Sequence, residues 1–318
     1  MPVKIIHDGD HGGDDFITTM LFLAYPEIFD LKAITTVTGN AGVTHTTRNA
    51  LLALDMAGRT DIPVYRGADK PLVIDYRLGD DAFGSDGLGN ISLESQSREL
   101  QEQGQDAISW LHDYLQSSPD PITLCVTGPA TNIALLLQKS PHIKTKIKKM
   151  VIMGGGVEIG GNIKPYAEFN FYMDPDAAHI VLNAGIPVVL HTLDTTQQAI
   201  YTKARQDVIR AMEPSLLANK IDAIMRITEE LEKKAFGAEG SFFHDHQVAA
   251  YLAMPDNYKT RKVHAEVLCE PASTEGGRLV VSDDPDGHVE LVTAMIDSDR
   301  FFAFVKDGLE RILKRHTD

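Results

Sequence analysis

The chain has 318 residues, of which 43% are hydrophobic and 24% charged, a composition typical of a globular protein with a full hydrophobic core. Its 30 lysines and arginines against 45 aspartates and glutamates give a formal net charge of −15. An acidic surface of this kind disfavours nucleic acid and anionic membranes as partners. Only two cysteines occur, Cys125 and Cys269, which excludes a disulfide framework and a cysteine-rich zinc site. With no signal-peptide core and no apolar run of roughly 20 residues, we expect a soluble cytoplasmic protein.

Short apolar runs alternate with segments of helical periodicity through the first part of the chain. The pattern predicts strands at residues 3–7, 31–37, 122–127, 149–153 and 187–190, and helices at residues 15–24, 44–57, 107–116, 131–137 and 175–184. Apolar strands separated by helices are typical of a parallel sheet that is covered on both faces. We therefore predict an α/β fold with an open, mostly parallel, Rossmann-like sheet and helices on both faces.

The pattern changes after about residue 194. Residues 202–236 are predicted to be helical throughout, and the charged end of this segment suggests a mobile flap. The predicted elements that follow are β-rich runs at 264–269, 279–282 and 288–295 and a closing helix at 300–313. Since no repeat or linker marks a boundary, we predict a single domain, residues 1–318, with a helical insertion at about residues 202–243.

Four aspartates are concentrated in the loop that follows the first predicted strand. They are separated by glycines and comprise Asp8, Asp10, Asp14 and Asp15. Four such charges repel one another unless a cation compensates them, and oxygen ligands on a flexible loop suit Ca²⁺ or Mg²⁺ better than zinc or copper. Alternatively, Asp14 and Asp15 begin a helix and interact with its positive end. Because that alternative leaves Asp8 and Asp10 unexplained, we favour a metal site.

The same loop permits a second interpretation. Asp8-Gly9-Asp10 fits the first half of the Asp-x-Asp loop of the aspartyl-nucleophile phosphohydrolases, which also follows a first strand. That class expects Thr or Val soon afterwards, whereas this chain has Gly12, and it has no use for a further pair of aspartates. A Mg²⁺-dependent phosphohydrolase with Asp8 or Asp10 as nucleophile is therefore kept as the alternative function.

Several motifs, in order along the chain, resemble those of the inosine–uridine preferring nucleoside hydrolases. The stretch KIIHDGDHGGDD is similar to their Asp-x-Asp-Pro-Gly-x-Asp-Asp signature, with His11 in place of the proline. The similarity continues through AITTVTGN, TGPATNIALLL, VIMGGG, AEFNFYMDPDAAHIVL and the pair His244-Asp245. The resemblance spans essentially the whole chain. It implies that the N-glycosidic bond of a ribonucleoside is hydrolysed to ribose and nucleobase by a Ca²⁺-bound water, in a homodimer or homotetramer.

The resemblance also assigns roles to individual residues. The implied Ca²⁺ ligands are the carboxylates of Asp10, Asp15 and Asp245 and the backbone carbonyl of Thr127. Asp10 would also accept the proton of the attacking water. The residues implied to contact the ribose are Asp14, Asn40, Met153, Asn162, Glu168 and Asn170. Carboxylates suit this chemistry, because breaking an N-riboside bond develops positive charge on the sugar.

The residues expected around the base depart from the family pattern. Phe83 stands where many relatives have His, residues 227–232 contain no tyrosine, and His246 replaces the usual proline. Phe83 can stack on a base but cannot donate a hydrogen bond to it. We expect His244 to protonate the leaving base, unless it merely begins a helix and faces water. The base preference is therefore open, and a relative that binds a nucleoside or ribose without turnover is a third interpretation.

Three of these polar residues also have plainer interpretations. Asn170 could cap the helix that begins near Asp174, and Glu168 could be a surface charge. Asn132, at the start of its own predicted helix, is expected to cap it.

Overall fold

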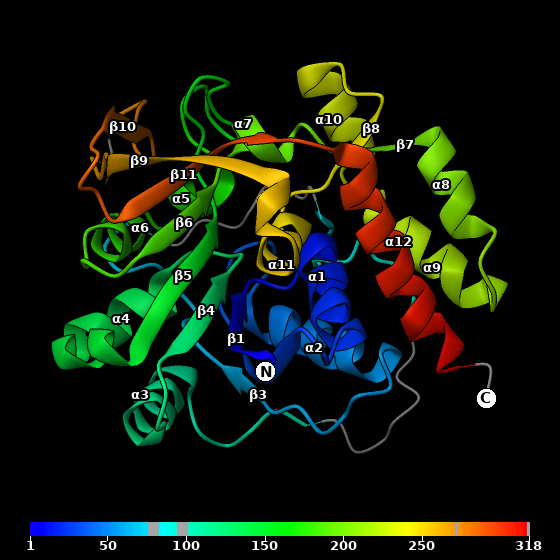
Figure 1. Ribbon diagram of the computed structural model, residues 1–318, viewed down its shortest axis with the longest axis horizontal. Helices are drawn as coiled ribbons and strands as arrows, with labels where there is room; N and C mark the ends of the chain where they lie inside the picture. The colour runs from blue at the N-terminus through cyan, green and yellow to red at the C-terminus, as the bar shows by residue number, and fades with distance from the viewer. Residues whose placement is uncertain (76–82, 94–100, 271–272, 317–318) are drawn as a thin grey trace.

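The computed structural model describes residues 1–75, 83–93, 101–270 and 273–316. Within them, nine strands form the main sheet: β1 (Val3–Gly9), β2 (Phe29–Thr36), β3 (Val64–Arg66), β4 (Ile122–Val126), β5 (Ile147–Met153), β6 (Val188–His191), β9 (Tyr258–Val267), β10 (Leu279–Asp283) and β11 (Val289–Met295). Their order is β10-β9-β11-β6-β5-β4-β1-β2-β3 (Figure 1). Only β9 pairs antiparallel with its neighbours. The predicted α/β fold with a mostly parallel sheet is confirmed.

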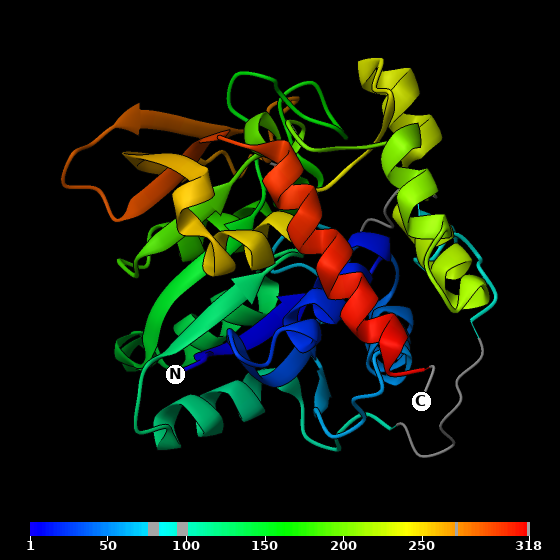
Figure 2. The same ribbon diagram turned by 45° about the vertical axis from the view of Figure 1, so that its right-hand side comes forward.

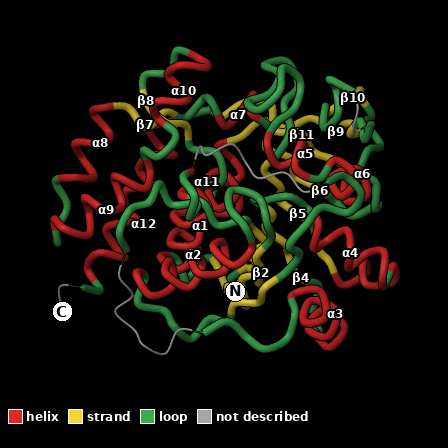
Figure 3. Tube along the Cα trace, turned by 180° about the vertical axis from the view of Figure 1, so that it is seen from behind, coloured by secondary structure: helices red, strands yellow, loops and turns green. Residues whose placement is uncertain are grey.

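Helices cover both faces of this sheet (Figures 1 and 3). They are α1 (Gly13–Ala24), α2 (Val43–Met56), α3 (Ala107–Ser117), α4 (Thr131–Lys139), α5 (Phe169–Met173), α6 (Pro175–Leu182), α7 (Leu193–Thr196), α8 (Lys203–Arg210), α9 (Ser215–Met225), α10 (Glu229–Phe236), α11 (His246–Ala253) and α12 (Ser298–Lys314). None of the helices in the described ranges is both long and apolar enough to span a membrane.

Neighbouring residues of the central strands pack into two separate hydrophobic cores. Ile5 of β1 belongs to the core formed with α1, α2, α11 and α12, whereas Ile6 belongs to the core formed with α3, α4 and α6. Cys125 and Leu124 of β4 divide between the two cores in the same way. Because side chains alternate across a strand, burial on both faces requires the continuous apolar runs seen in the sequence.

The segment 202–236 is not helical throughout, contrary to the prediction. It consists of α8, α9 and α10, and the break before α9 contains Pro214, which cannot donate an amide hydrogen bond inside a helix. The helices of the segment lie together along one side of the molecule (Figure 2). Two short strands, β7 (Ile200–Thr202) and β8 (Gly240–Phe242), pair antiparallel at the ends of the segment. The periodicity detected the helices but not these pairings, which join residues far apart in the sequence.

The strands that matter most for function lie at the centre of the sheet. β1, β4 and β5 are neighbours and run parallel, so the turns that follow them meet at one edge. The aspartate loop follows β1, Thr127 follows β4, and Met153 ends β5. The fold thereby brings together residues that are more than a hundred positions apart.

Candidate active site

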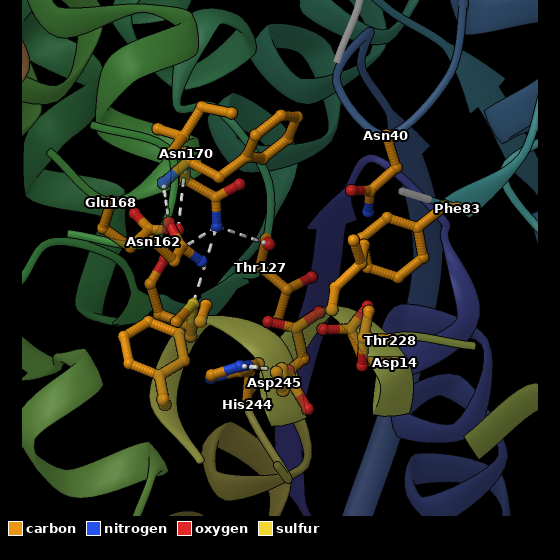
Figure 4. Close-up of a pocket in the computed structure, with 17 residues that line it drawn as sticks. Asp14, Asn40, Phe83, Thr127, Asn162, Glu168, Asn170, Thr228, His244 and Asp245 are labelled. Atoms are coloured by element: carbon orange, nitrogen blue, oxygen red, sulfur yellow. Dashed lines mark hydrogen bonds and ion pairs between the residues drawn. The ribbon is translucent and has the colours of Figure 1, made fainter. Parts of the chain in front are cut away.

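A cavity of about 140 Å³ lies at this edge of the sheet (Figure 4). Ten of the residues singled out from the sequence line it: Asp14, Asn40, Phe83, Thr127, Met153, Asn162, Glu168, Asn170, His244 and Asp245. Asp10 and Asp15 are fully buried and do not contribute to its lining. Figure 4 shows Asn162, Glu168 and Asn170 on one side of the cavity, with Asn40 and Phe83 on the other.

Carboxylates of the aspartate loop form a cluster with a carboxylate from a distant segment. Asp14, Asp15 and Asp245 each place one oxygen within 4.8 Å of the others. Burial raises the pKa of Asp15 and of Asp245 well above the ordinary value, and the charges of Asp10 and Asp14 raise it further. These acids cannot all ionise in a dry site without a compensating cation. An all-oxygen cluster on a glycine-rich loop suits a hard cation such as Ca²⁺.

Asp10 has one carboxylate oxygen bound and one free. Its Oδ2 accepts a hydrogen bond of 2.7 Å from the backbone N–H of Asn40, whereas its Oδ1 is buried and has no partner among the described residues. The backbone leaves room for this carboxylate, since a Cβ at Gly128 would lie 2.8 Å from Oδ1. Burial, then the charge of Asp14, raises the pKa of Asp10 well above its usual range. The free oxygen can bind a cation or accept a proton.

Asn170 joins the ends of two neighbouring strands. Its side-chain amide donates to the carbonyl oxygens of Thr127, at 2.9 Å, and Met153, at 3.2 Å. The suggestion that Asn170 caps the next helix is wrong, because Asp174 caps α6 by accepting from Ala177 N–H at 3.0 Å. Asn170 therefore holds two turns of the site together.

Glu168 is not a surface charge, because only 2% of it is exposed. Its carboxylate caps α5 and accepts from the backbone N–H of Asn170, at 2.9 Å, and of Gly155, at 2.8 Å. Burial raises its pKa, and the backbone donors act against this rise. The neighbouring Asn162 accepts from Phe169 N–H at 2.9 Å. One loop and a short helix thus present a set of polar groups to the cavity.

His244 lies at the cavity wall with 13% of its side chain exposed, so it does not face bulk water. Its Nδ1 lies 2.7 Å from Thr196 Oγ1, and its Nε2 lies 3.2 Å from Glu232 Oε1. Burial alone would lower the pKa of His244, but Glu232 and the charges of Asp14 and Glu168 outweigh it, so that the pKa is raised. Glu232 therefore favours the protonated imidazole.

One wall of the cavity includes the segment that the resemblance places around the base, residues 227–232, although its lining residues were not predicted individually. It comes from α10 and the residue before it: Thr228, Leu231, Glu232, Ala235 and Phe236. Four of these, from 228 to 235, follow the spacing i, i+3, i+4, i+7 of a single helical face, which is the signal that could have identified them. The acidic stretch that lacks a tyrosine instead supplies a carboxylate to His244.

Asp8 lies outside the cavity lining, unlike Asp14. Its Oδ1 accepts from Thr35 Oγ1 and, at 2.7 Å, from Asn132 Nδ2. Asn132 does not cap α4, whose first turn follows Ala130. Its side-chain nitrogen also donates to Thr36 O, at 3.0 Å, and its Oδ1 accepts from Ala68 N–H, at 2.8 Å, so that Asn132 joins the ends of β1, β2 and β3. This structural role leaves Asp8 poorly placed to act as a phosphohydrolase nucleophile.

Known proteins are similar to this chain over nearly its whole length. A profile of the family described as "Inosine-uridine preferring nucleoside hydrolase" matches residues 5–303. The pyrimidine-specific ribonucleoside hydrolase RihA of Citrobacter koseri is 37% identical over 94% of this chain and 95% of its own. An uncharacterized protein of Schizosaccharomyces pombe is 39% identical over 98% of this chain and 100% of its own.

A solved structure shares the fold as well. The purine-preferring ribonucleoside hydrolase from Gardnerella vaginalis superposes with a TM-score of 0.89 at 27% identity, covering 98% of this chain and 99% of that chain. The segment matched by the family profile contains every carboxylate of the cluster.

Proposed function

Since the chain belongs to the inosine–uridine preferring nucleoside hydrolase family and is therefore a ribonucleoside hydrolase, we propose that it works with Ca²⁺ in the cavity described above. The observation that carries this proposal is the cluster of Asp14, Asp15 and Asp245, of which the last two are buried, together with the free oxygen of Asp10. Ca²⁺ prefers six to eight oxygen ligands. Asp10, Asp15, Asp245 and the Thr127 carbonyl would hold it, with Asp14 beside them.

The residues around the cation divide the chemical work. When bound, Ca²⁺ supplies a Lewis acid that lowers the pKa of a water molecule and orients it. Asp10 accepts a proton from that water through its free oxygen. The water oxygen forms a bond to C1′ of the ribose while the bond from C1′ to the base nitrogen breaks. The electron pair of the breaking bond leaves with the base. The carboxylates stabilise the positive charge that develops on the sugar.

The leaving base requires a proton. His244 faces the cavity, and its raised pKa keeps the imidazole protonated closer to neutral pH. We assign His244 as the donor of a proton to a base nitrogen, which releases a neutral nucleobase and free ribose. Proton exchange with solvent then restores Asp10 and His244.

Phe83, Leu231 and Phe236, which all line the cavity, offer apolar surface for the base. A relative named as pyrimidine-specific is 37% identical to this chain, whereas one named as purine-preferring is 27% identical. On this ground we propose uridine and cytidine as the preferred substrates, ahead of inosine.

A substrate panel tests the proposal. Purified protein with Ca²⁺ is incubated with uridine, cytidine, inosine and p-nitrophenyl phosphate, and both reducing sugar and phosphate are measured. We expect reducing sugar from the nucleosides and no phosphate. Phosphate release would instead support the phosphohydrolase alternative, and nucleoside binding without either product would indicate a relative that has lost turnover.

A further inference from the structure

Five buried side chains form a continuous row of hydrogen bonds that ends on the carboxylate cluster. His11 Nε2 lies 3.1 Å from Thr19 Oγ1, which lies 3.0 Å from His7 Nδ1. His7 Nε2 lies 2.8 Å from Thr127 Oγ1, and this hydroxyl donates to Asp15 Oδ1 at 2.5 Å. All five are buried, with exposures of at most 1%. The hydrolysis described above uses only the last two of them.

When Asp15 is ionised, as a ligand of Ca²⁺ would be, the protons in this row have one consistent arrangement, because a hydroxyl and a neutral imidazole each have a single proton to donate. Thr127 gives its proton to Asp15, so it accepts from His7 Nε2–H. His7 Nδ1 is then bare and accepts the Thr19 hydroxyl, whose oxygen in turn accepts His11 Nε2–H. Both imidazoles are fully buried, and a neutral ring avoids the cost of burying a charge.

The contact at the far end is longer than those within the row, since His11 Nδ1 lies 3.4 Å from the carbonyl oxygen of Gly9. In this arrangement His11 Nδ1 has no proton to donate to that oxygen. Every hydrogen bond in the row therefore points toward Asp15, and each donor is held in place by the one before it.

The backbone and the sequence are both adapted to the row. A Cβ at Gly9 would overlap Asp15 Oδ1 and lie 2.7 Å from Thr127 Oγ1. Glycine at this position thus allows the carboxylate and the hydroxyl to meet. His11, which begins the row, stands where the family signature has proline. The row therefore begins at a residue by which this chain departs from that signature.

We propose that His11, Thr19 and His7 are positioning residues, which orient the Thr127 hydroxyl and through it the Asp15 carboxylate for Ca²⁺. The inference rests on the proposed function, because it assigns Asp15 and the Thr127 carbonyl as ligands. Since Thr127 supplies both the hydroxyl and the carbonyl, the row fixes two ligands at once. Partners that orient metal ligands typically contribute about 10- to 100-fold to metal affinity.

Calorimetric titration of the metal-free full-length protein with Ca²⁺ tests the proposal. Thr127→Val removes the hydroxyl but keeps the carbonyl, and we expect it to raise the Kd about 10- to 100-fold. Thr19→Val interrupts the row at a residue that is three hydrogen bonds away from Asp15, and we expect it to raise the Kd at least about threefold. Thr19→Ser keeps the hydroxyl and should bind as the wild type does. Thr123→Val is the matched control, a buried threonine of β4 whose hydroxyl has no partner in the described chain.

The double variant distinguishes a row from independent contacts. If the row acts as a unit, Thr19→Val should cost little further affinity once Thr127→Val has broken the last bond. Unchanged affinity in Thr19→Val, or losses that simply multiply in the double variant, would overturn the positioning role and leave the proposed function intact. A wild-type protein that binds no Ca²⁺ would overturn both.

Discussion

Asp10 is the residue on which the proposed chemistry depends most. One oxygen is fixed by the backbone of Asn40 and the other is buried without a partner among the described residues. A buried carboxylate oxygen left unpaired is costly unless it has a ligand or a proton. Asp8, two residues earlier, also has one oxygen bound, by Thr35 and Asn132, and a buried Oδ2 without a partner among the described residues. The two differ in their surroundings, because in addition to burial the charges of Asp14 and Glu168 act on the pKa of Asp10, whereas burial and hydrogen bonds alone act on that of Asp8. We therefore assign Asp8 a structural role and Asp10 a role in metal binding and proton transfer.

This difference predicts the outcome of matched substitutions. Asp10→Asn removes the proton acceptor and weakens metal binding, so we expect kcat for uridine to fall by a factor on the order of 10² to 10⁴. Asp8→Asn keeps an oxygen that can accept from Thr35 and Asn132, so kcat should stay within about threefold of the wild type. Steady-state kinetics on both variants decides. Near-normal kcat in Asp10→Asn would mean that another residue accepts the proton.

His244 makes a differential prediction. If it protonates the base, His244→Ala should lower kcat for inosine by about 10² to 10⁴. The same variant should largely spare p-nitrophenyl riboside, because its leaving group departs without a proton. Initial rates on both substrates are compared in wild type and variant. Equal losses on the two substrates would assign His244 to structure or to sugar positioning.

At the scale of elements, the sequence predicts the parts of the site that are local. The aspartate loop is readable because a buried strand, a turn and a helix follow one another directly. The prediction that Asn132 caps a helix is wrong, because its partners, Asp8, Thr36 and Ala68, lie on distant segments. β7 and β8 were not predicted either, because each has only three residues and pairs with a strand that is distant in the sequence.

Helix α10 supplies the wall of the cavity nearest the expected base. Leu231 is 47% exposed there, so a bound base should cover it. We expect Leu231→Ala to raise KM for uridine about tenfold with little change in kcat, because the lost contact acts equally before and during the reaction. Lys234→Ala, outside the cavity lining, is the matched control and should leave KM unchanged. A KM unaffected by Leu231→Ala would place the base elsewhere.

At the scale of the whole molecule, the fold brings together buried carboxylates whose ionisation lowers the stability of the folded protein. Asp10, Asp15 and Asp245 have raised pKa values in the folded chain, so the folded state binds more protons than the unfolded one above the ordinary value of 3.8. The stability of the metal-free protein should therefore fall as pH rises above that value. A cation that pairs with the ionised carboxylates reverses this loss.

The stabilisation by Ca²⁺ should consequently grow with pH. We expect saturating Ca²⁺ to raise Tm more at about pH 8 than at about pH 5, relative to protein in excess chelator. Scanning calorimetry at the two pH values measures the difference. A Ca²⁺ effect that is equal at both values would show that these carboxylates are not the groups the cation binds.

The central claim is that the carboxylate cluster holds a Ca²⁺ ion on which ribonucleoside hydrolysis depends. Its most direct test is a titration of metal-free protein with Ca²⁺ while ribose release from uridine is followed. The account predicts no release before Ca²⁺ is added and a rate that rises until one equivalent per chain is bound. Full activity in protein shown to be free of metal, or a rate that does not respond to Ca²⁺, would contradict it.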